Sequence, residues 1–221
     1  MEAVAARIAP AAVLQSHVTV AGLRRALGDC VLAVSFLLAM LPAGREISFT
    51  LAGAANVVWV TGAAIMAVMS FARFAPLSAT VNLGTIAASG AMLILPCFMR
   101  PISLSSGALA TVGLVFELFG VVLTQVARVY MGRSFGILPA NRGIVSKGPF
   151  RWVRHPIYFG WLVLSIGYAM SYANPRNILL IFVTLPFMVW RIDQEEEHLS
   201  ADAGYRSYMD RVRYRLLPGV I

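Results

Sequence analysis

Long apolar segments, separated by short polar ones, dominate the chain. An α-helix needs about 20 mostly apolar residues to cross the roughly 30 Å of hydrocarbon in a bilayer. Six segments approach or reach that length, and flanking residues extend the shorter ones. Each is predicted to form a transmembrane helix, with approximate bounds of 26–42, 47–72, 76–99, 107–130, 156–173 and 177–190.

Composition excludes most other classes of protein. Hydrophobic residues make up 59% of the 221 residues and charged residues 13%, against about 45–50% and about 25% in soluble proteins. So few charges would leave the surface of a soluble domain apolar, and a disordered chain would be more polar. Cys30 and Cys97 lie in apolar runs, so a disulfide scaffold is not expected. The predicted fold class is an all-α integral membrane helical bundle.

The basic residues indicate orientation in a membrane. The net charge is +8, but the basic side chains fall between the apolar segments, so nucleic acid is not an expected partner. With six spans, only Arg45, Arg100 and Arg176 lie opposite the termini, which leaves 15 of 18 on the side of the termini. Lys and Arg concentrate on the cytoplasmic side. We therefore expect a multi-pass protein of the cell (inner) membrane, with both termini cytoplasmic.

Polar chemistry is concentrated in the second half of the chain. Residues 111–221 contain seven of the ten acidic residues and two of the three histidines, whereas residues 1–110 are almost entirely apolar. Three histidines without an HxxxH spacing, and without paired cysteines, do not make a metal-ligand set, so no metal is expected. Any chemistry is expected in the second half, near the cytoplasmic face, with a bound cofactor supplying the difficult step.

A polar, glycine-rich loop leads into the fifth apolar segment. Residues 131–156 read MGRSFGILPANRGIVSKGPFRWVRHP and contain neither GxGxxG nor a P-loop. The loop is either an ordinary basic turn region or a functional loop, as loops of this length often are. The RHPIYFG run at its end places Arg154, His155 and Tyr158 beside a helix N-terminus, which favours an anion such as a ligand carboxylate. Alternatively, His155 only anchors the helix at the membrane boundary.

The sixth apolar segment runs into RIDQEEEHL without glycine or proline, so its helix is predicted to continue. Arg191 and Glu195 then share one face. They form either an exposed salt bridge of small value or part of a functional site at the membrane boundary. In the fourth segment, Glu117 and Arg128 share a face and are expected to support helix packing, with Arg128 reaching the interface. Residues 205–219 are expected to lie on anionic lipid or to act as a lid.

Taken together, these motifs resemble the isoprenylcysteine carboxyl methyltransferase family and its bacterial and phospholipid methyltransferase relatives. The resemblance rests on GRSFG, RGIV and GPFRWVRHPIYFGW, then a helical hairpin joined at Asn174 and Pro175, then WRIDQEEEHL, YRSY and VRYRLLPG. It covers residues 111–221, whereas the three spans in residues 1–110 carry no family signature. We therefore divide the chain into N-terminal transmembrane helices, 1–110, and a methyltransferase core, 111–221.

The resemblance implies an integral membrane enzyme that uses S-adenosyl-L-methionine and releases S-adenosyl-L-homocysteine. Its pocket would lie at the cytoplasmic end of the last spans, formed by the loop before RHPxY and by the C-terminal segment. Arg191, near the methyl acceptor, and Glu195, which would hold the cofactor, are implied to be the catalytic residues. The positions implied to bind the cofactor are Arg142, Gly143, Ile144, Val145, Phe150, His155, Pro156, Ile157, Tyr158 and Glu195.

The implied acceptor is the carboxylate of an isoprenylcysteine-like or other lipidic substrate, small molecule or protein, that enters from the membrane lipids. A carboxylate is already a nucleophile and needs only orientation, which the guanidinium of Arg191 supplies. The amine of a phospholipid is an alternative acceptor, and it would need a base such as Glu196 or His198. The chain could instead be an NADPH-dependent sterol-type membrane reductase, which shares RHPxYxG, or a non-enzymatic membrane scaffold.

Overall fold

The computed structural model describes residues 29–30, 33–34, 51–72, 74–100, 107–136 and 138–219. Apart from four positions, the first predicted span, 26–42, lies outside the described residues. The two ends of the chain, on which the predicted orientation depends, also lie outside them. The other five predicted spans correspond to helices, namely α2 (Leu51–Phe71), α3 (Leu83–Ile94), α4 (Ala108–Met131), α5 (Pro156–Ser171) and α6 (Pro175–Leu199). A short helix, α7 (Ala203–Arg211), follows.

Two of these helical stretches, Ala108–Ser134 and Pro175–Leu199, are long and apolar enough to cross a membrane. Three shorter apolar helices, Val60–Phe71, Leu83–Phe98 and Pro156–Ser171, lie beside them within the described part of the chain. The sixth span was predicted to end at residue 190 and its helix to continue. Helix α6 does continue, passing through Pro186 and ending at Leu199. Six transmembrane crossings remain a prediction.

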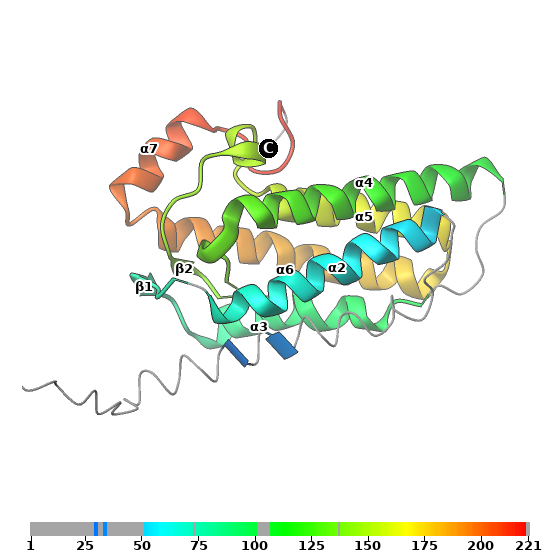
Figure 1. The fold of residues 1–221 in the computed structure, drawn as a ribbon, viewed down its shortest axis with the longest axis horizontal. Helices are drawn as coiled ribbons and strands as arrows, with labels where there is room; N and C mark the ends of the chain where they lie inside the picture. The colour runs from blue at the N-terminus through cyan, green and yellow to red at the C-terminus, as the bar shows by residue number, and fades with distance from the viewer. Residues whose placement is uncertain are drawn as a thin grey trace, which may run out of the picture.

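The fold is mostly helical, but the predicted all-α class needs one correction. Two short strands, β1 (Ser78–Ala79) and β2 (Ala140–Asn141), pair antiparallel, with Ser78 opposite Asn141. They lie at the same end of the bundle as α7 (Figure 1). Each strand has only two residues, which is too short to show the alternating pattern by which a strand is recognised in a sequence. The pairing joins the connection before α3 to the loop after α4.

Helices α4 and α5 pack closely along their length, as Figure 1 shows. Glycines make this approach possible. A Cβ atom on Gly120 would collide with the backbone of α5 at Leu164, and one on Gly167 would lie 2.6 Å from the carbonyl oxygen of Gly113. Small residues allow helix backbones to approach in membrane bundles. The contact fixes the position of α5, whose N-terminus carries the RHPIY motif.

Helix ends are defined by local sequence. Asn82 and Thr85 form a capping box at the start of α3, in which each side chain accepts a hydrogen bond from the other's backbone N–H. Asn174 caps α6 by accepting a hydrogen bond from the backbone N–H of Arg176 at 2.9 Å, and Pro175 occupies the first turn. These caps fix where the helices that carry site residues begin.

The loop between α4 and α5 folds back over one end of the bundle and contains two 3-10 turns, Gly132–Ser134 and Gly148–Arg151. The C-terminal segment packs against its end. The backbone N–H groups of Arg154 and His155 donate to the carbonyl oxygens of Tyr214 and Arg215 at 2.9 and 2.8 Å. Figure 1 shows this loop, α7 and the C-terminus gathered at the same end.

Candidate active site

A cavity of about 420 Å³ lies where the α4–α5 loop, the start of α5, the end of α6 and α7 meet. It extends between α3, α4 and α5 as far as Tyr172. The structure places on its wall every residue that the resemblance implied to contact the cofactor or the acceptor, namely Arg142, Gly143, Ile144, Val145, Phe150, His155, Pro156, Ile157, Tyr158, Arg191 and Glu195. The α4–α5 loop, the start of α5 and the end of α6 contribute these residues, and α7 contributes other wall residues.

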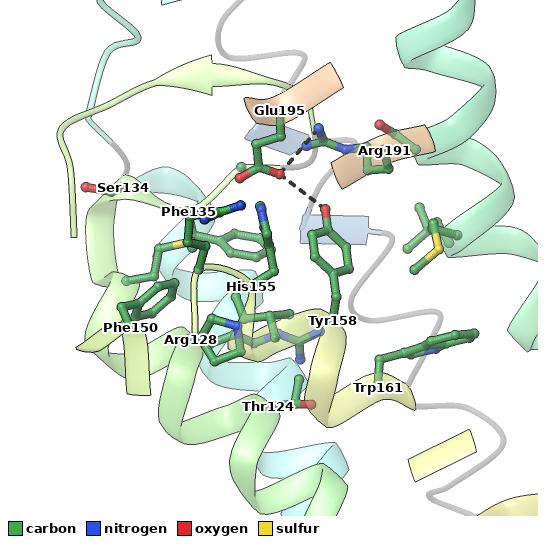
Figure 2. A pocket seen from close by; sticks show the side chains of 18 of the residues that line it. Thr124, Arg128, Ser134, Phe135, Phe150, His155, Tyr158, Trp161, Arg191 and Glu195 are labelled. Atoms are coloured by element: carbon green, nitrogen blue, oxygen red, sulfur yellow. Dashed lines mark hydrogen bonds and ion pairs between the residues drawn. The ribbon is translucent and has the colours of Figure 1, made fainter. Parts of the chain in front are cut away.

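Arg191, Glu195 and Tyr158 form the polar centre of the cavity. Arg191 is 3% exposed, and its Nη1 lies 3.4 Å from Oε2 of Glu195, one turn further along α6. The Tyr158 hydroxyl donates a hydrogen bond to the same oxygen at 3.3 Å (Figure 2). Arg191 and Glu195 therefore share one face of α6, as predicted from their spacing. Because Arg191 is buried, the pair is not the exposed surface salt bridge that was one of the two interpretations.

Glu196, the next residue on α6, belongs to a different set of contacts. Its Oε1 accepts hydrogen bonds from Nε of Arg154 at 2.7 Å and from Nε2 of His155 at 2.9 Å. Its Oε2 lies 2.8 Å from Nη2 of Arg215, whose Nη1 also contacts Asp193. Arg154 further donates to two carbonyl oxygens of the C-terminal segment. Glu196 thus joins α6, the start of α5 and the C-terminal segment.

The two residues considered as a base for an amine acceptor lie elsewhere. Neither Glu196 nor His198 is among the residues that line the cavity. Glu196 is occupied by its contacts with Arg154, His155 and Arg215. The ring of His198 contacts the hydroxyls of Ser78 and Thr80 at 3.0 and 2.7 Å, which attaches α6 to β1 and its flank. Among the described residues, no group of three His, Cys, Asp or Glu is arranged to hold a metal ion.

The loop that carries Arg142 and Gly143 is held by side-chain hydrogen bonds. Gly143 has a φ of +99°, which favours glycine, and its N–H donates to Oδ1 of Asn141 at 3.0 Å. The amide of Asn141 donates to the carboxylate of Asp202 at 2.8 Å. That hydrogen bond, followed by one from the backbone of Gly204, lowers the pKa of Asp202. The loop is therefore attached directly to the cap of α7.

Helix α7 forms a wall of the cavity through Tyr205 and Tyr208, both buried. The Tyr208 hydroxyl donates to the carbonyl oxygen of Phe150 at 2.8 Å. Burial raises the pKa of Tyr208 to about 12 and raises that of Tyr205 as well. The C-terminal region had been expected to lie on lipid or to act as a lid. Tyr205 and Tyr208 place this helix on the cavity wall, in agreement with the family resemblance, which implied that the C-terminal segment forms part of the pocket. Contact with lipid and a lid role stay predictions.

Several other wall residues were not assigned to the site from the sequence. Arg128 was expected to reach the membrane interface, but it lines the cavity and donates to Oε1 of Gln125 at 3.3 Å. Figure 2 shows Arg128 below His155, with Thr124 and Trp161 further along the same wall. Glu117 also lines the cavity. Its common face with Arg128 was visible in the sequence, but the cavity on that face was not.

Comparison with known proteins agrees with the motifs. Residues 102–204 match the model of the family described as phospholipid methyltransferase. The chain is 35% identical over 114 residues to protein-S-isoprenylcysteine O-methyltransferase of Xenopus laevis. The matched region covers 47% of this chain and 39% of that protein. The enzyme of the same name from Dictyostelium discoideum is 30% identical over 53% of each chain.

Protein-S-isoprenylcysteine O-methyltransferase A of Arabidopsis thaliana is 32% identical over 45% of this chain and 55% of that protein. The chain thus spans about half the length, or less, of these curated relatives. The matches confirm the resemblance inferred from the motifs: the second half of the chain is similar to the phospholipid methyltransferase family and to the protein-S-isoprenylcysteine O-methyltransferases.

Proposed function

We propose that the chain is an integral membrane methyltransferase that transfers a methyl group from S-adenosyl-L-methionine to the carboxylate of a lipidic, isoprenylcysteine-like substrate. The observation that carries the proposal is the convergence on one cavity of all eleven positions implied to contact the cofactor or the acceptor, with a buried Arg191–Glu195 pair at its centre. The names of the relatives support the same reaction class. Methyltransferase chemistry would then reside in residues 111–221, with residues 1–110 as membrane scaffold.

The chemistry of the cavity wall fits the proposed cofactor. Bound S-adenosyl-L-methionine would supply an electrophilic methyl group on a positively charged sulfonium. Carboxylate and aromatic groups stabilise such a cation, and Glu195, Tyr158 and Phe150 provide them on three sides of the cavity. Arg142, Gly143, Ile144 and Val145 form the adjoining loop edge, and His155, Pro156 and Ile157 the helix edge. These residues would bind the cofactor and exclude water.

Arg191 is the residue that we assign to the acceptor. Its guanidinium is buried at the same end of the cavity as Glu195, and a planar guanidinium orients a carboxylate through two parallel hydrogen bonds. A carboxylate needs no general base. An amine acceptor would need one, and both candidates, Glu196 and His198, are hydrogen-bonded outside the cavity wall. The arrangement therefore favours a carboxylate acceptor over a phospholipid amine.

The location in the membrane follows from the same proposal. The cavity centre lies at the end of α6 where the helix becomes polar, beside most of the arginines of the second half. We place this end, with both termini, on the cytoplasmic side of the cell membrane. The cofactor would then enter from water, while the acyl or isoprenoid part of the acceptor enters laterally between helices.

Methyl transfer itself tests the proposal. Membranes containing the full chain are supplied with methyl-labelled S-adenosyl-L-methionine and either an S-alkylated cysteine with a free carboxylate, its amide, or phosphatidylethanolamine. We expect label in the free-carboxylate acceptor alone, with none after Arg191→Ala. Label in phosphatidylethanolamine only would overturn the choice of acceptor. If no acceptor is labelled and NADPH alone stabilises the protein against heat, the methyltransferase assignment is wrong and a reductase replaces it.

A further inference from the structure

A second polar position lies deep in the same cavity, far from Arg191. Glu117 of α4 is 7% exposed and lines the cavity wall. The Ser171 hydroxyl hydrogen-bonds to this carboxyl group, but the buried Oε1 atom itself has no hydrogen-bond partner among the residues that the structure describes. The hydroxyl of Thr124, two turns along α4 and on the same wall, is also buried and without a partner in that part of the chain. An unpaired carboxyl oxygen among apolar helices is costly, which makes a functional role the default interpretation.

The depth of Glu117 can be located on α5. A Cβ atom on Gly167 would lie 2.6 Å from the backbone nitrogen of Glu117, so the two residues are at the same level. Tyr158, which contacts Glu195, is nine residues earlier on α5. At a rise of 1.5 Å per residue, that separation is roughly 13 Å along the helix axis. The cavity spans it, because Trp161, Ser165 and Tyr168 line the wall between and beyond the two levels.

A purely hydrocarbon chain would leave this carboxyl oxygen unsatisfied. The wall at this depth is also more polar than a plain hydrocarbon tail requires, since Ser165 and Tyr168 contribute hydroxyl groups beside Glu117. An unsatisfied buried acceptor atom is costly, and a ligand that brings a donor to Oε1 would remove that cost. A hydroxyl or amino group on the ligand chain is such a donor.

We propose that Glu117 forms a deep subsite for a hydrogen-bond donor, a hydroxyl or amine, carried along the chain of an amphiphile whose carboxylate head lies at Arg191. The inference rests on the proposed function for the position of the head group, and it narrows the acceptor to chains with a second polar group. Thr124 lies two helical turns from Glu117, at the level of Gly160 near the head-group end, so its hydroxyl belongs to a different level of the cavity.

Binding of fatty acids to the detergent-purified full chain tests the subsite. The probes are octadecanoate, its derivative hydroxylated at carbon twelve, and its derivative hydroxylated at carbon two as a positional control. An amino group at carbon twelve forms a separate arm that distinguishes an amine from a hydroxyl. We expect the carbon-twelve derivatives to bind about tenfold more tightly than the other two, which corresponds to about 1.4 kcal/mol.

Glu117→Leu should abolish that preference while leaving octadecanoate binding unchanged. Glu117→Gln, which keeps the side-chain shape, should reduce the preference at least threefold and so serves if the leucine variant does not fold. Phe116→Leu, at an exposed neighbouring position, is the matched control and should retain the preference. Equal binding of all probes by wild type, or a preference that persists in both Glu117 variants, would show that this carboxyl serves helix packing only.

A parallel titration with S-adenosyl-L-homocysteine keeps this result separate from the proposed function. Its affinity should be the same in wild type and the Glu117 variants, because Glu117 is far from Glu195. If wild type does not bind S-adenosyl-L-homocysteine but still prefers the carbon-twelve derivatives, the methyltransferase assignment fails and the subsite stands. If it binds S-adenosyl-L-homocysteine but shows no preference among fatty acids, the subsite fails alone.

Discussion

Glu195 and Glu196 are neighbours in the sequence, yet they face different surroundings. Glu195 faces the cavity, where it contacts Arg191 and Tyr158. Glu196 faces away from it and is surrounded by Arg154, His155 and Arg215. We call the first group the ligand face of α6 and the second the supporting face. One turn of α6 thus presents the carboxylate of Glu195 to a ligand and the carboxylate of Glu196 to other parts of the protein.

The difference explains how a site made from four segments keeps its shape. The supporting face holds the start of α5 and the C-terminal segment to α6 by charged hydrogen bonds, which are the stronger kind. The ligand face has longer contacts, at 3.3 and 3.4 Å, and Glu195 keeps 22% of its side chain exposed. Substitutions on the supporting face should therefore affect stability, and those on the ligand face should affect binding and turnover.

The largest effect is expected from Glu196→Ala. The substitution removes the carboxylate that pairs with Arg154 and Arg215 and accepts a hydrogen bond from His155. Loss of one partner from a buried charged group costs about 3–5 kcal/mol. Thermal unfolding in detergent should show a large fall in Tm. Glu197→Ala, at an exposed position on the same helix, should change the free energy of unfolding by no more than about 0.5 kcal/mol. Equal Tm values for the two variants would contradict the supporting role.

The next effect is expected at the contact that positions α5. In Gly120→Ala, the added methyl group collides with the backbone of Leu164, so the helices must separate at a cost of about 1–3 kcal/mol. Gly90→Ala on α3 is a suitable control because a Cβ atom there meets nothing within 4 Å. The control should leave Tm unchanged or raise it. A comparable fall in Tm for both would mean that close α4–α5 packing does not hold the site.

On the ligand face, Arg191→Lys should separate binding from turnover. A lysine retains the charge but not the planar pair of donors, so kcat is expected to fall about tenfold, or about 1.4 kcal/mol in activation free energy. Affinity for S-adenosyl-L-homocysteine should remain within about twofold of wild type. Arg176→Lys, exposed at the other end of α6, is the control for replacing arginine. An unchanged kcat would remove Arg191 from the acceptor site.

The smallest effect concerns Asp202, which attaches α7 to the loop. The hydrogen bond from Asn141 lowers its pKa in the folded protein below the ordinary value of 3.8. The ionised carboxylate therefore adds stability above pH 3.8, and that contribution is lost as the pH falls through the lower folded pKa. The Tm difference between wild type and Asp202→Asn should be small at neutral pH and smaller at about pH 3. A difference that grows with acid would contradict this sign.

Sequence patterns located the ligand face well, because its residues depend on local spacing. Arg191 and Glu195 are one helical turn apart, and no glycine or proline interrupts their helix. Tyr158 lies in the RHPIY motif at the start of α5. These relations hold in any fold that keeps the two helices.

Long-range packing could not be inferred in the same way. The partners of Glu196 come from residues 19 to 42 positions away, and nothing in RIDQEEEHL distinguishes it from Glu195. Arg128 was placed at the interface because the cavity that it enters exists only once α4, α5 and the loop have packed. The β1–β2 pair, with two residues per strand, left no pattern to read.

The most direct test of the central claim is calorimetric titration of the detergent-purified full chain with S-adenosyl-L-homocysteine, comparing wild type, Glu195→Ala and Glu197→Ala. The two substitutions remove the same charge from the same stretch of α6, but only Glu195 lines the cavity. We predict binding by wild type and Glu197→Ala, and affinity at least about tenfold weaker in Glu195→Ala. Absence of binding by well-folded wild type, or equal affinity in all three proteins, would contradict the assignment of this cavity to the cofactor.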